Sequence, residues 1–149
     1  MTAEAALMAT DVAVPDSHID LLTRPIVGVL TTMLPDGQPQ SSLVWVDYDG
    51  TCARINTTLE RRKGRDLLAN PRVSLLVVDP ADTSRFVQVR GEAELVTEGA
   101  EEHLDALTRR YTRHPAYYGF IYPAEQRARE TRVICRIHAR RVTLDAIHR

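Results

Sequence analysis

The chain has 149 residues, of which 44% are hydrophobic and 26% charged, and its 19 basic and 20 acidic side chains leave a net charge of −1. This length favours one domain with its own core, and the composition excludes a disordered chain, a fibrous repeat and a polycation that coats nucleic acid. No stretch reaches the roughly 18 apolar residues of a membrane helix, and residues 1–13 lack the basic flank and apolar run of a signal peptide. We therefore expect a cytoplasmic protein with neither a membrane nor a nucleic-acid partner.

The cysteines and histidines give no local sign of a metal site or a disulfide scaffold. Cys52 and Cys135 form no C-x-x-C pair, and no Cys/His group along the chain has zinc spacing. We expect both thiols to behave as small buried apolar side chains, and we expect no bound metal. Four histidines are expected on the surface: His18, His103, His138 and His148.

The first half of the chain indicates an arm, a short helix and three strands. Residues 1–14 show no periodicity and predict a flexible N-terminal arm, with a single domain over residues 15–149. A short helix is expected around residues 16–22, and it should end there because Pro25 lies just beyond it. Runs of β-branched and apolar residues, separated by Pro35-Asp36-Gly37 and Asp49-Gly50, predict strands over residues 26–33, 40–48 and 51–58. We expect these three strands to pair as an antiparallel meander.

The second half combines helices with further strands. Residues 61–69 predict a short helix that ends at Asn70-Pro71, and Thr97 begins a second helix that ends before Pro115. Four strands are predicted over residues 73–78, 86–96, 133–138 and 142–144, the first buried on both faces and the second bent or bulged at Gly91. Six or seven mostly antiparallel strands with two or three helices make a mainly β (α+β) fold. A sheet with so few helices is expected to close into a small barrel.

A basic run at the start of the first of these two helices is the feature most suggestive of chemistry. Arg61, Arg62, Lys63 and Arg65 follow a strand that ends in two threonines, and Lys63 is the single lysine among 18 arginines. Cations are unfavourable at a helix N-terminus, so an anion such as phosphate is expected to balance them. Gly64 would let a phosphate approach the backbone closely. The alternative is a basic turn that is simply solvated.

Several motifs together resemble a known family. Residues 26–33, the turn Pro35-Asp36-Gly37 and the segment from Gln38 to Trp45 resemble the opening of the split-barrel flavin/deazaflavin oxidoreductases, the relatives of pyridoxamine 5′-phosphate oxidase. The later motifs resemble the branch that uses coenzyme F420: Asn56-Thr57-Thr58, Arg61-x-Lys63-x-Arg65-x-Leu67, Asn70-Pro71-Arg72-Val73 and Arg90-Gly91-Glu92-Ala93. The resemblance runs from about Leu21 to Leu95 and continues more weakly to Leu144.

The resemblance implies a split β-barrel of the FMN-binding kind, forming a homodimer with its cofactor at the subunit interface. Arg61 and Lys63 would hold the cofactor phosphate, with Gly64 beside them, and Asn56 and Thr57 would line the path of the phosphate and side chain. Four residues of the second strand would face the flat ring: Gln40, Ser41, Ser42 and Val44.

The implied activity is that of an F420-dependent oxidoreductase, which transfers a hydride from reduced F420 to a small conjugated or aromatic substrate. Because such a cofactor does the hard chemistry, few acid–base groups are needed, and we assign no catalytic residue. The alternatives are an FMN-binding enzyme of the pyridoxamine 5′-phosphate oxidase kind and a non-catalytic F420-binding or carrier protein.

The role of the aromatic residues is left open by the sequence. Tyr117, Tyr118 and Tyr122 either roof a substrate pocket or merely pack the segment that carries them. His114 is the one histidine expected near a site, because it adjoins these tyrosines. Trp45 is expected to be a core or dimer contact rather than a partner that stacks on the cofactor ring.

Overall fold

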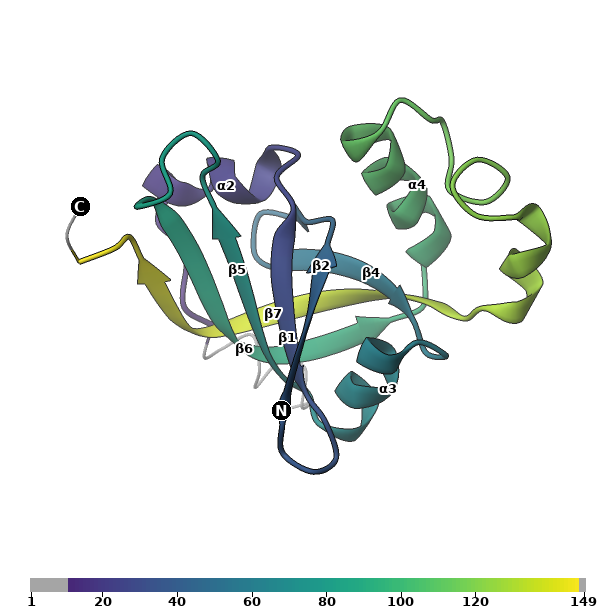
Figure 1. Cartoon of the computed structure of the whole chain (residues 1–149), viewed down its shortest axis with the longest axis horizontal. Coiled ribbons are helices and arrows are strands. Elements are labelled where there is room, and N and C mark those ends of the chain that lie inside the picture. Colours follow the sequence, from purple (N-terminus) through teal and green to yellow (C-terminus); the bar gives the residue numbers. More distant parts are fainter. Residues whose placement is uncertain (1–10, 148–149) are drawn as a thin grey trace.

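The structure is a computed structural model that describes residues 11–147, and its centre is a single curled sheet (Figure 1). Seven strands pair antiparallel in the order β2-β1-β5-β6-β7-β4-β3. They are β1 (Gly28–Met33), β2 (Pro39–Val44), β3 (Asp47–Tyr48), β4 (Ala53–Thr58), β5 (Arg72–Val78), β6 (Phe86–Val96) and β7 (Arg132–Leu144). The helices are α2 (Asp20–Thr23), α3 (Arg62–Ala69) and α4 (Ala100–Tyr111), with 3₁₀ turns η1 (Asp16–His18) and η2 (Ala124–Arg129). The mainly β prediction is confirmed, and the curled, incompletely closed sheet is that of a split barrel.

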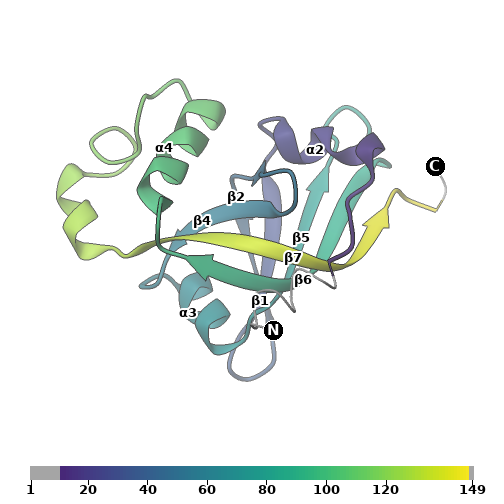
Figure 2. The ribbon, with the colours of Figure 1, turned by 180° about the vertical axis from the view of Figure 1, so that it is seen from behind.

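The core lies inside the curl of the sheet. Alternate residues of β1, β4 and β5 point inward, as the period of two along a strand requires, and Leu30, Ile55 and Leu75 are completely buried there. Helices α2 and α3 lie at opposite ends of the sheet, as the two opposite views agree (Figures 1 and 2). Leu21 of α2 and Leu67 of α3 join the same core cluster, so both helices close ends of one hydrophobic interior.

The predicted meander is wrong, because the expected strand 40–48 is two strands. β2 pairs with β1 at one edge of the sheet, whereas β3 pairs with β4 at the other. Only Trp45 and Val46 separate β2 from β3, so the chain steps directly from one edge of the curled sheet to the other. This step is possible because the curl brings the two edges together, an arrangement that local sequence patterns do not contain.

A tyrosine from α4 bridges the place where the barrel is split. The Tyr111 hydroxyl accepts a hydrogen bond from the Val46 backbone N–H at 2.9 Å and donates to the Ile26 carbonyl at 2.7 Å. Buried backbone groups need such partners, and no ladder supplies them here. Tyr111 therefore takes the place of a strand-to-strand hydrogen bond at this point.

Strand β7 differs from the sequence prediction in being continuous. It pairs with β4 over its first half and with β6 over most of its length, where two closing strands were expected. The register shifts between Arg90 and Gly91, which confirms the irregularity predicted for β6 at this glycine. A Cβ on Gly91 would lie 1.9 Å from the His138 carbonyl oxygen, so only glycine permits this close approach.

Strand β5 is buried on one face only, contrary to the expectation of two buried faces. Val73, Leu75 and Val77 point into the core, whereas Leu76 and Val78 are partly exposed on the outer face. The outer face of the sheet is thus partly apolar at β5.

Residues 1–10 of the predicted arm, and His148, lie outside the described part of the chain. Residues 11–14 run along β7: the Val12 N–H donates to the Ala139 carbonyl at 2.8 Å, and Val14 is buried in the core. None of the described helices is long and apolar enough to cross a membrane.

Candidate functional site

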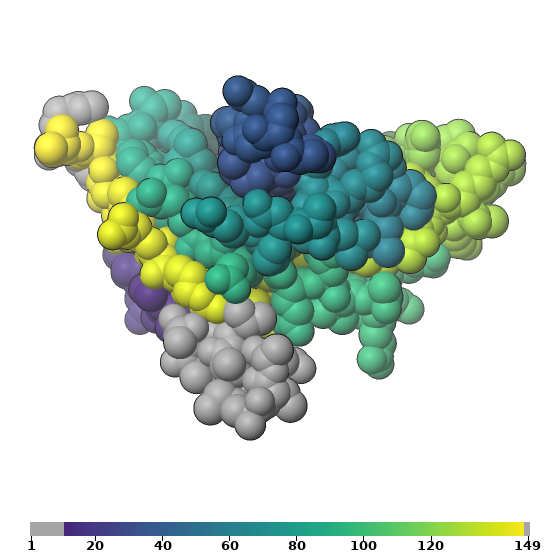
Figure 3. Space-filling view, turned by 90° about the horizontal axis from the view of Figure 1, so that it is seen from below, coloured from purple at the N-terminus to yellow at the C-terminus, as the bar shows by residue number. Residues whose placement is uncertain are grey.

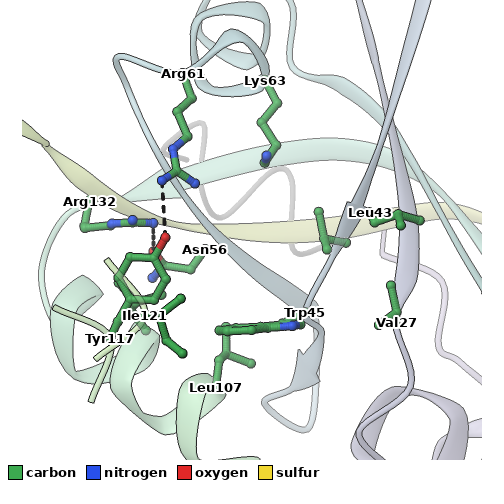
Figure 4. A pocket seen from close by; sticks show the side chains of 12 residues that line it. Val27, Leu43, Trp45, Asn56, Arg61, Lys63, Leu107, Tyr117, Ile121 and Arg132 are labelled. Carbon is green, nitrogen blue, oxygen red and sulfur yellow. Dashed lines mark hydrogen bonds between the residues drawn. The ribbon is translucent and has the colours of Figure 1, made fainter. Parts of the chain in front are cut away.

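A cavity of about 320 Å³ opens between β2, the start of α3 and helix α4 (Figure 4). Apolar side chains form much of its wall: Val27, Leu43, Val44, Trp45, Leu104, Leu107 and Ile121. Polar and charged side chains form the rest: Asn56, Arg61, Lys63, Tyr117 and Arg132. The cavity therefore combines an apolar region that suits a flat ring with a cationic region that suits an anion.

The cationic end of the cavity carries more positive than negative charge. Arg61 and Arg132 share the carboxylate of Glu130, at 3.6 and 3.3 Å respectively. Lys63 makes no ion pair with any residue between 11 and 147. Three cations and one carboxylate leave a local excess of two positive charges, which favours an anionic ligand such as a phosphate.

Burial and this positive charge both act on the Lys63 side chain. Burial lowers its pKa, and the nearby positive charges of Arg61 and Arg132 lower it further. Its ammonium group is thus destabilised by the surroundings that the chain itself provides. An anion bound beside it would reverse this effect.

The local fold explains why Arg61 and Lys63 meet at the cavity. The Arg61 backbone N–H donates to the Thr58 hydroxyl at 3.0 Å, which fixes the turn between β4 and α3. The first backbone N–H groups of α3 have no acceptor within the helix, as at any helix start, and they add to the positive potential. Figure 4 shows both side chains descending from this turn toward the cavity. The turn thus presents cations and backbone donors together.

Arg132, at the start of β7, is a residue of the cavity that the sequence did not reveal. Its guanidinium group lies 4.7 Å from the centre of the Tyr117 ring and 5.5 Å from that of Tyr118. Its Nε also donates to the Tyr118 hydroxyl at 2.9 Å. These contacts hold a nearly buried arginine rigidly, but no local motif surrounds Arg132 that would have signalled it.

A chain of hydrogen bonds fixes the orientation of Asn56. Its side-chain nitrogen donates to the Ala100 carbonyl at 2.8 Å and lies 3.1 Å from Nδ1 of His103. On the other side of the imidazole, Nε2 lies 3.1 Å from the Asp47 carboxylate. Both contacts are satisfied when Nε2 donates to Asp47 and Nδ1 accepts from Asn56. The Asn56 amide oxygen is left to face Arg132, 3.4 Å away, and the cavity.

Asp47, the last residue in this series of hydrogen bonds, is a stably ionised carboxylate. Burial raises its pKa, but hydrogen bonds from His103 and from Arg54 outweigh burial, so the pKa falls to about 2. Arg54 binds both carboxylate oxygens, at 2.9 and 2.8 Å. His103 is therefore buried between fixed partners, and the prediction that it lies on the surface is wrong; His18 and His138 are buried too.

The structure brings together four of the nine residues assigned from the sequence: Val44, Asn56, Arg61 and Lys63 line the cavity. Gln40, Ser41 and Ser42 lie on edge strand β2 but do not line it, and the Ser41 hydroxyl lies 2.9 Å from that of Thr31. Thr57 is buried beside Asn56, and its hydroxyl oxygen has no hydrogen-bond partner within residues 11–147.

Gly64 has a packing role that differs from the predicted one. A Cβ at this position would lie 1.9 Å from the Thr58 carbonyl oxygen, so the glycine lets α3 pack against the end of β4. It does not line the cavity. Because glycine has no side chain, α3 can pack closely against β4, and this contact positions Arg61 and Lys63.

The sequence left open whether the tyrosines line a pocket or only pack their own segment, and Tyr117 and Tyr118 differ in this respect. Tyr117 lines the cavity and receives a hydrogen bond from Arg61 at 3.3 Å, whereas Tyr118 packs against Arg132 outside it. Trp45 lines the cavity and stacks on Tyr111 with ring centres 5.6 Å apart. His114 is exposed beside Phe120 and does not reach the cavity.

Comparisons with known proteins agree with this fold. A solved F420 reductase is 34% identical, with a TM-score of 0.74, over 87% of this chain and 98% of that chain. A conserved hypothetical protein from Mycobacterium tuberculosis is 29% identical, with a TM-score of 0.68, over 92% of this chain and 87% of that chain. The pyridoxine/pyridoxamine 5′-phosphate oxidase of Bordetella petrii is 41% identical over 81 residues, and those residues span 53% of this chain but only 37% of that oxidase.

The family profile described as pyridoxamine 5′-phosphate oxidase matches residues 14–144. That span includes all seven strands and every residue that lines the cavity. The chain belongs to the pyridoxamine 5′-phosphate oxidase family.

Proposed function

We propose that this chain is a cytoplasmic oxidoreductase that binds coenzyme F420 in the cavity and uses it to reduce a small conjugated or aromatic substrate. The observation that carries the proposal is that a cationic surface and an apolar surface adjoin within one cavity. An excess of two positive charges at Arg61, Lys63 and Arg132 adjoins an apolar wall that includes Trp45 and Leu107. A cofactor with a phosphate and a flat heterocycle matches both.

The residues present fit such a cofactor. Arg61 and Lys63 would hold its phosphate, since a guanidinium forks onto two oxygens and an ammonium supplies a compact charge. The Asn56 amide oxygen would accept a hydrogen bond from a hydroxyl of the cofactor side chain. Reduced F420 supplies the hydride, and the apolar wall excludes water from the place of transfer.

F420 is favoured over FMN by the extent of the similarity. The F420 reductase aligns with nearly its whole length, whereas the oxidase of Bordetella petrii aligns over little more than a third of its own. An FMN-dependent activity of the pyridoxamine 5′-phosphate oxidase kind is the second candidate, supported by the 41% identity of that shorter stretch.

A second copy of the chain would complete the site. Val27 and Leu43, which line the cavity, are 48% and 74% exposed. Leu43 pairs across the ladder with Val29, and Val29 with Leu76, so an apolar row continues from the cavity mouth across the outer face of the sheet. A homodimer that buries this row would also cover the open side of the cavity. Light scattering is expected to show a dimer, and a monomer at micromolar concentration would contradict this arrangement.

The experiment that tests the function compares the two cofactors directly. Purified protein is titrated with F420 and with FMN separately by fluorescence, and then with both in competition. Oxidation of reduced F420 is next followed against a panel of conjugated and aromatic electrophiles. We expect tighter binding of F420 and turnover with at least one substrate. Equal or tighter binding of FMN would favour the oxidase activity, and binding of F420 without turnover would favour a carrier.

A further inference from the structure

A second cluster of reactive side chains lies where the N-terminal segment runs along β7, and none of its members lines the cavity. Asp11, Cys52 and His138 are separated by more than 40 positions in the sequence, yet their ligand atoms all lie within 4.8 Å of one another. An Asp11 carboxylate oxygen lies 2.8 Å from Nδ1 of His138, and the Cys52 sulfur lies 3.8 Å from the same nitrogen. We propose that these three side chains bind a divalent transition-metal ion of the zinc type.

Two of the three distances between the donor atoms are close to the edges of a tetrahedral site. Zinc–nitrogen and zinc–oxygen bonds of about 2.0 Å and a zinc–sulfur bond of about 2.3 Å give tetrahedral edges of about 3.3 Å between nitrogen and oxygen and about 3.5 Å between nitrogen and sulfur. The distances of 2.8 and 3.8 Å differ from these edges by a few tenths of an ångström. To admit the ion, Asp11 would move away from His138 while keeping its ion pair with Arg140 at 2.6 Å, and the Cys52 sulfur would move closer to both.

The chemistry of the donors selects the kind of ion. One imidazole, one thiolate and one carboxylate form a borderline donor set, which suits Zn²⁺ or Co²⁺ better than Ca²⁺ or Mg²⁺, since those ions prefer oxygen ligands. Three protein ligands leave the fourth tetrahedral position for water. On binding, the Cys52 thiol would release its proton and become the thiolate ligand.

A fourth side chain holds the imidazole in the orientation that a ligand needs. Nε2 of His138 lies 2.9 Å from a Glu94 carboxylate oxygen, which turns Nδ1 toward Asp11 and Cys52. A metal-binding histidine almost always donates its other N–H to such a partner. Glu94 is itself held by Arg136 at 3.0 Å, so the orientation is fixed from the sheet. His138 is fully buried and Cys52 is nearly so, which would shield a bound ion from solvent.

The ion would link the N-terminal segment to the barrel. Asp11 precedes the first element of the fold, whereas Cys52 lies before β4 and His138 within β7. A ligand that binds only the folded state stabilises that state by mass action. Zinc would therefore tie residue 11 to the sheet and raise the thermal midpoint of the whole domain.

The test uses untagged full-length protein, freed of metal with a chelator and titrated with Co²⁺ and Zn²⁺ alone. We expect one Co²⁺ per chain, with the near-ultraviolet charge-transfer band of a cobalt thiolate, and displacement of Co²⁺ by Zn²⁺. Cys52→Ala is expected to abolish the band, whereas Cys135→Ala, which removes the other buried thiol, keeps it. Glu94→Gln is expected to weaken Co²⁺ binding by about 10- to 100-fold, the usual effect of losing the partner of a ligating histidine.

The outcomes separate a metal site from a purely ionic cluster. Absence of a thiolate band in the wild type, together with an unchanged thermal midpoint on adding Zn²⁺, would overturn the proposal. So would a band that persists in Cys52→Ala. Because the wild-type titration decides the question by itself, a variant that fails to fold does not leave it unanswered.

Discussion

Nε2 of His103 lies 3.1 Å from a carboxylate oxygen of Asp47, and this contact ties helix α4 to the edge strand β3. The same imidazole lies 3.1 Å from the side-chain nitrogen of Asn56, which lines the cavity. A buried carboxylate at the margin of the barrel thus determines which end of an amide faces the proposed ligand. The contact therefore joins two elements of the fold and would also orient a side chain of the proposed site.

Asp47→Asn is expected to destabilise the protein at neutral pH and to lose that effect in acid. The folded protein lowers the pKa of this carboxyl from 3.8 to about 2. At about 1.4 kcal/mol per pKa unit, the ionised group contributes on the order of 2 kcal/mol to the free energy of unfolding. Because the folded pKa lies below the unfolded one, this contribution is present above about pH 4 and is lost as the pH falls through about 2.

The measurement is urea unfolding of the wild type and of Asp47→Asn across this range. The difference between their free energies of unfolding should narrow as the pH falls from about 5 to about 2. A difference that stays constant would show that Asp47 acts through its shape and not its charge.

Tyr111→Phe is expected to destabilise the protein by about 1–3 kcal/mol, because it leaves buried backbone groups of Ile26 and Val46 without their partner. The ring that stacks on Trp45 is kept, so packing changes little. Tyr48→Phe is the matched control, since its hydroxyl bonds the Gly50 carbonyl at an exposed position and its loss should cost less than about 0.5 kcal/mol. Equal effects of the two variants in chemical denaturation would refute the bridging role of Tyr111.

Lys63→Ala is expected to weaken F420 binding by about 10- to 150-fold, the equivalent of losing a charge-assisted hydrogen bond of about 1.5–3 kcal/mol. Arg61→Ala should have an effect of similar size. Lys63→Arg should recover only part of the affinity, because a planar fork does not reproduce a point charge. Arg65→Ala is the matched control: it removes a cation from the same basic run, but Arg65 is exposed and does not line the cavity.

The affinities are measured by fluorescence titration at low and at high ionic strength, and the wild type should bind less tightly in salt. If Lys63→Ala and Arg65→Ala weaken binding equally, the basic run acts only as a diffuse charge. If neither does, the phosphate does not bind at the start of α3.

Gly64→Ala is expected to destabilise the protein by about 1–3 kcal/mol, the usual cost of an overpacked contact, although alanine favours a helix more than glycine does. The reason is the 1.9 Å approach of the new Cβ to the Thr58 carbonyl oxygen. Leu68→Ala on the same helix provides the control, because Leu68 is 61% exposed and its truncation should change stability by less than about 0.5 kcal/mol. A stabilised Gly64→Ala variant would mean that α3 shifts freely, and the placement of Arg61 and Lys63 would then not depend on this contact.

Two outer parts of the molecule differ in how well the sequence predicts them. The surface view from below shows the tip of the β1–β2 hairpin as a separate projection and the segment after α4 as a lobe at one end (Figure 3). The hairpin was expected from Pro35-Asp36-Gly37, because turn chemistry is local. The lobe contacts the cavity through Tyr117 and Arg132. This contact depends on how β7 enters the sheet, which local sequence patterns do not predict.

Local sequence patterns were enough to predict the mainly β fold, the positions of most strands, the basic turn at Arg61 and Lys63 and the family. Each of these depends on neighbouring residues: alternation along a strand, turn residues between strands, and charge at a helix start. The pairing of β4 with β7, and the crossing of Trp45 and Val46 between the two edges of the sheet, could be seen only in the folded molecule. The same is true of the contact by which His103 orients Asn56 and of the contact between Asp11 and His138. These contacts join residues far apart in the chain, and the curl of a sheet that buries one continuous core determines which of them meet.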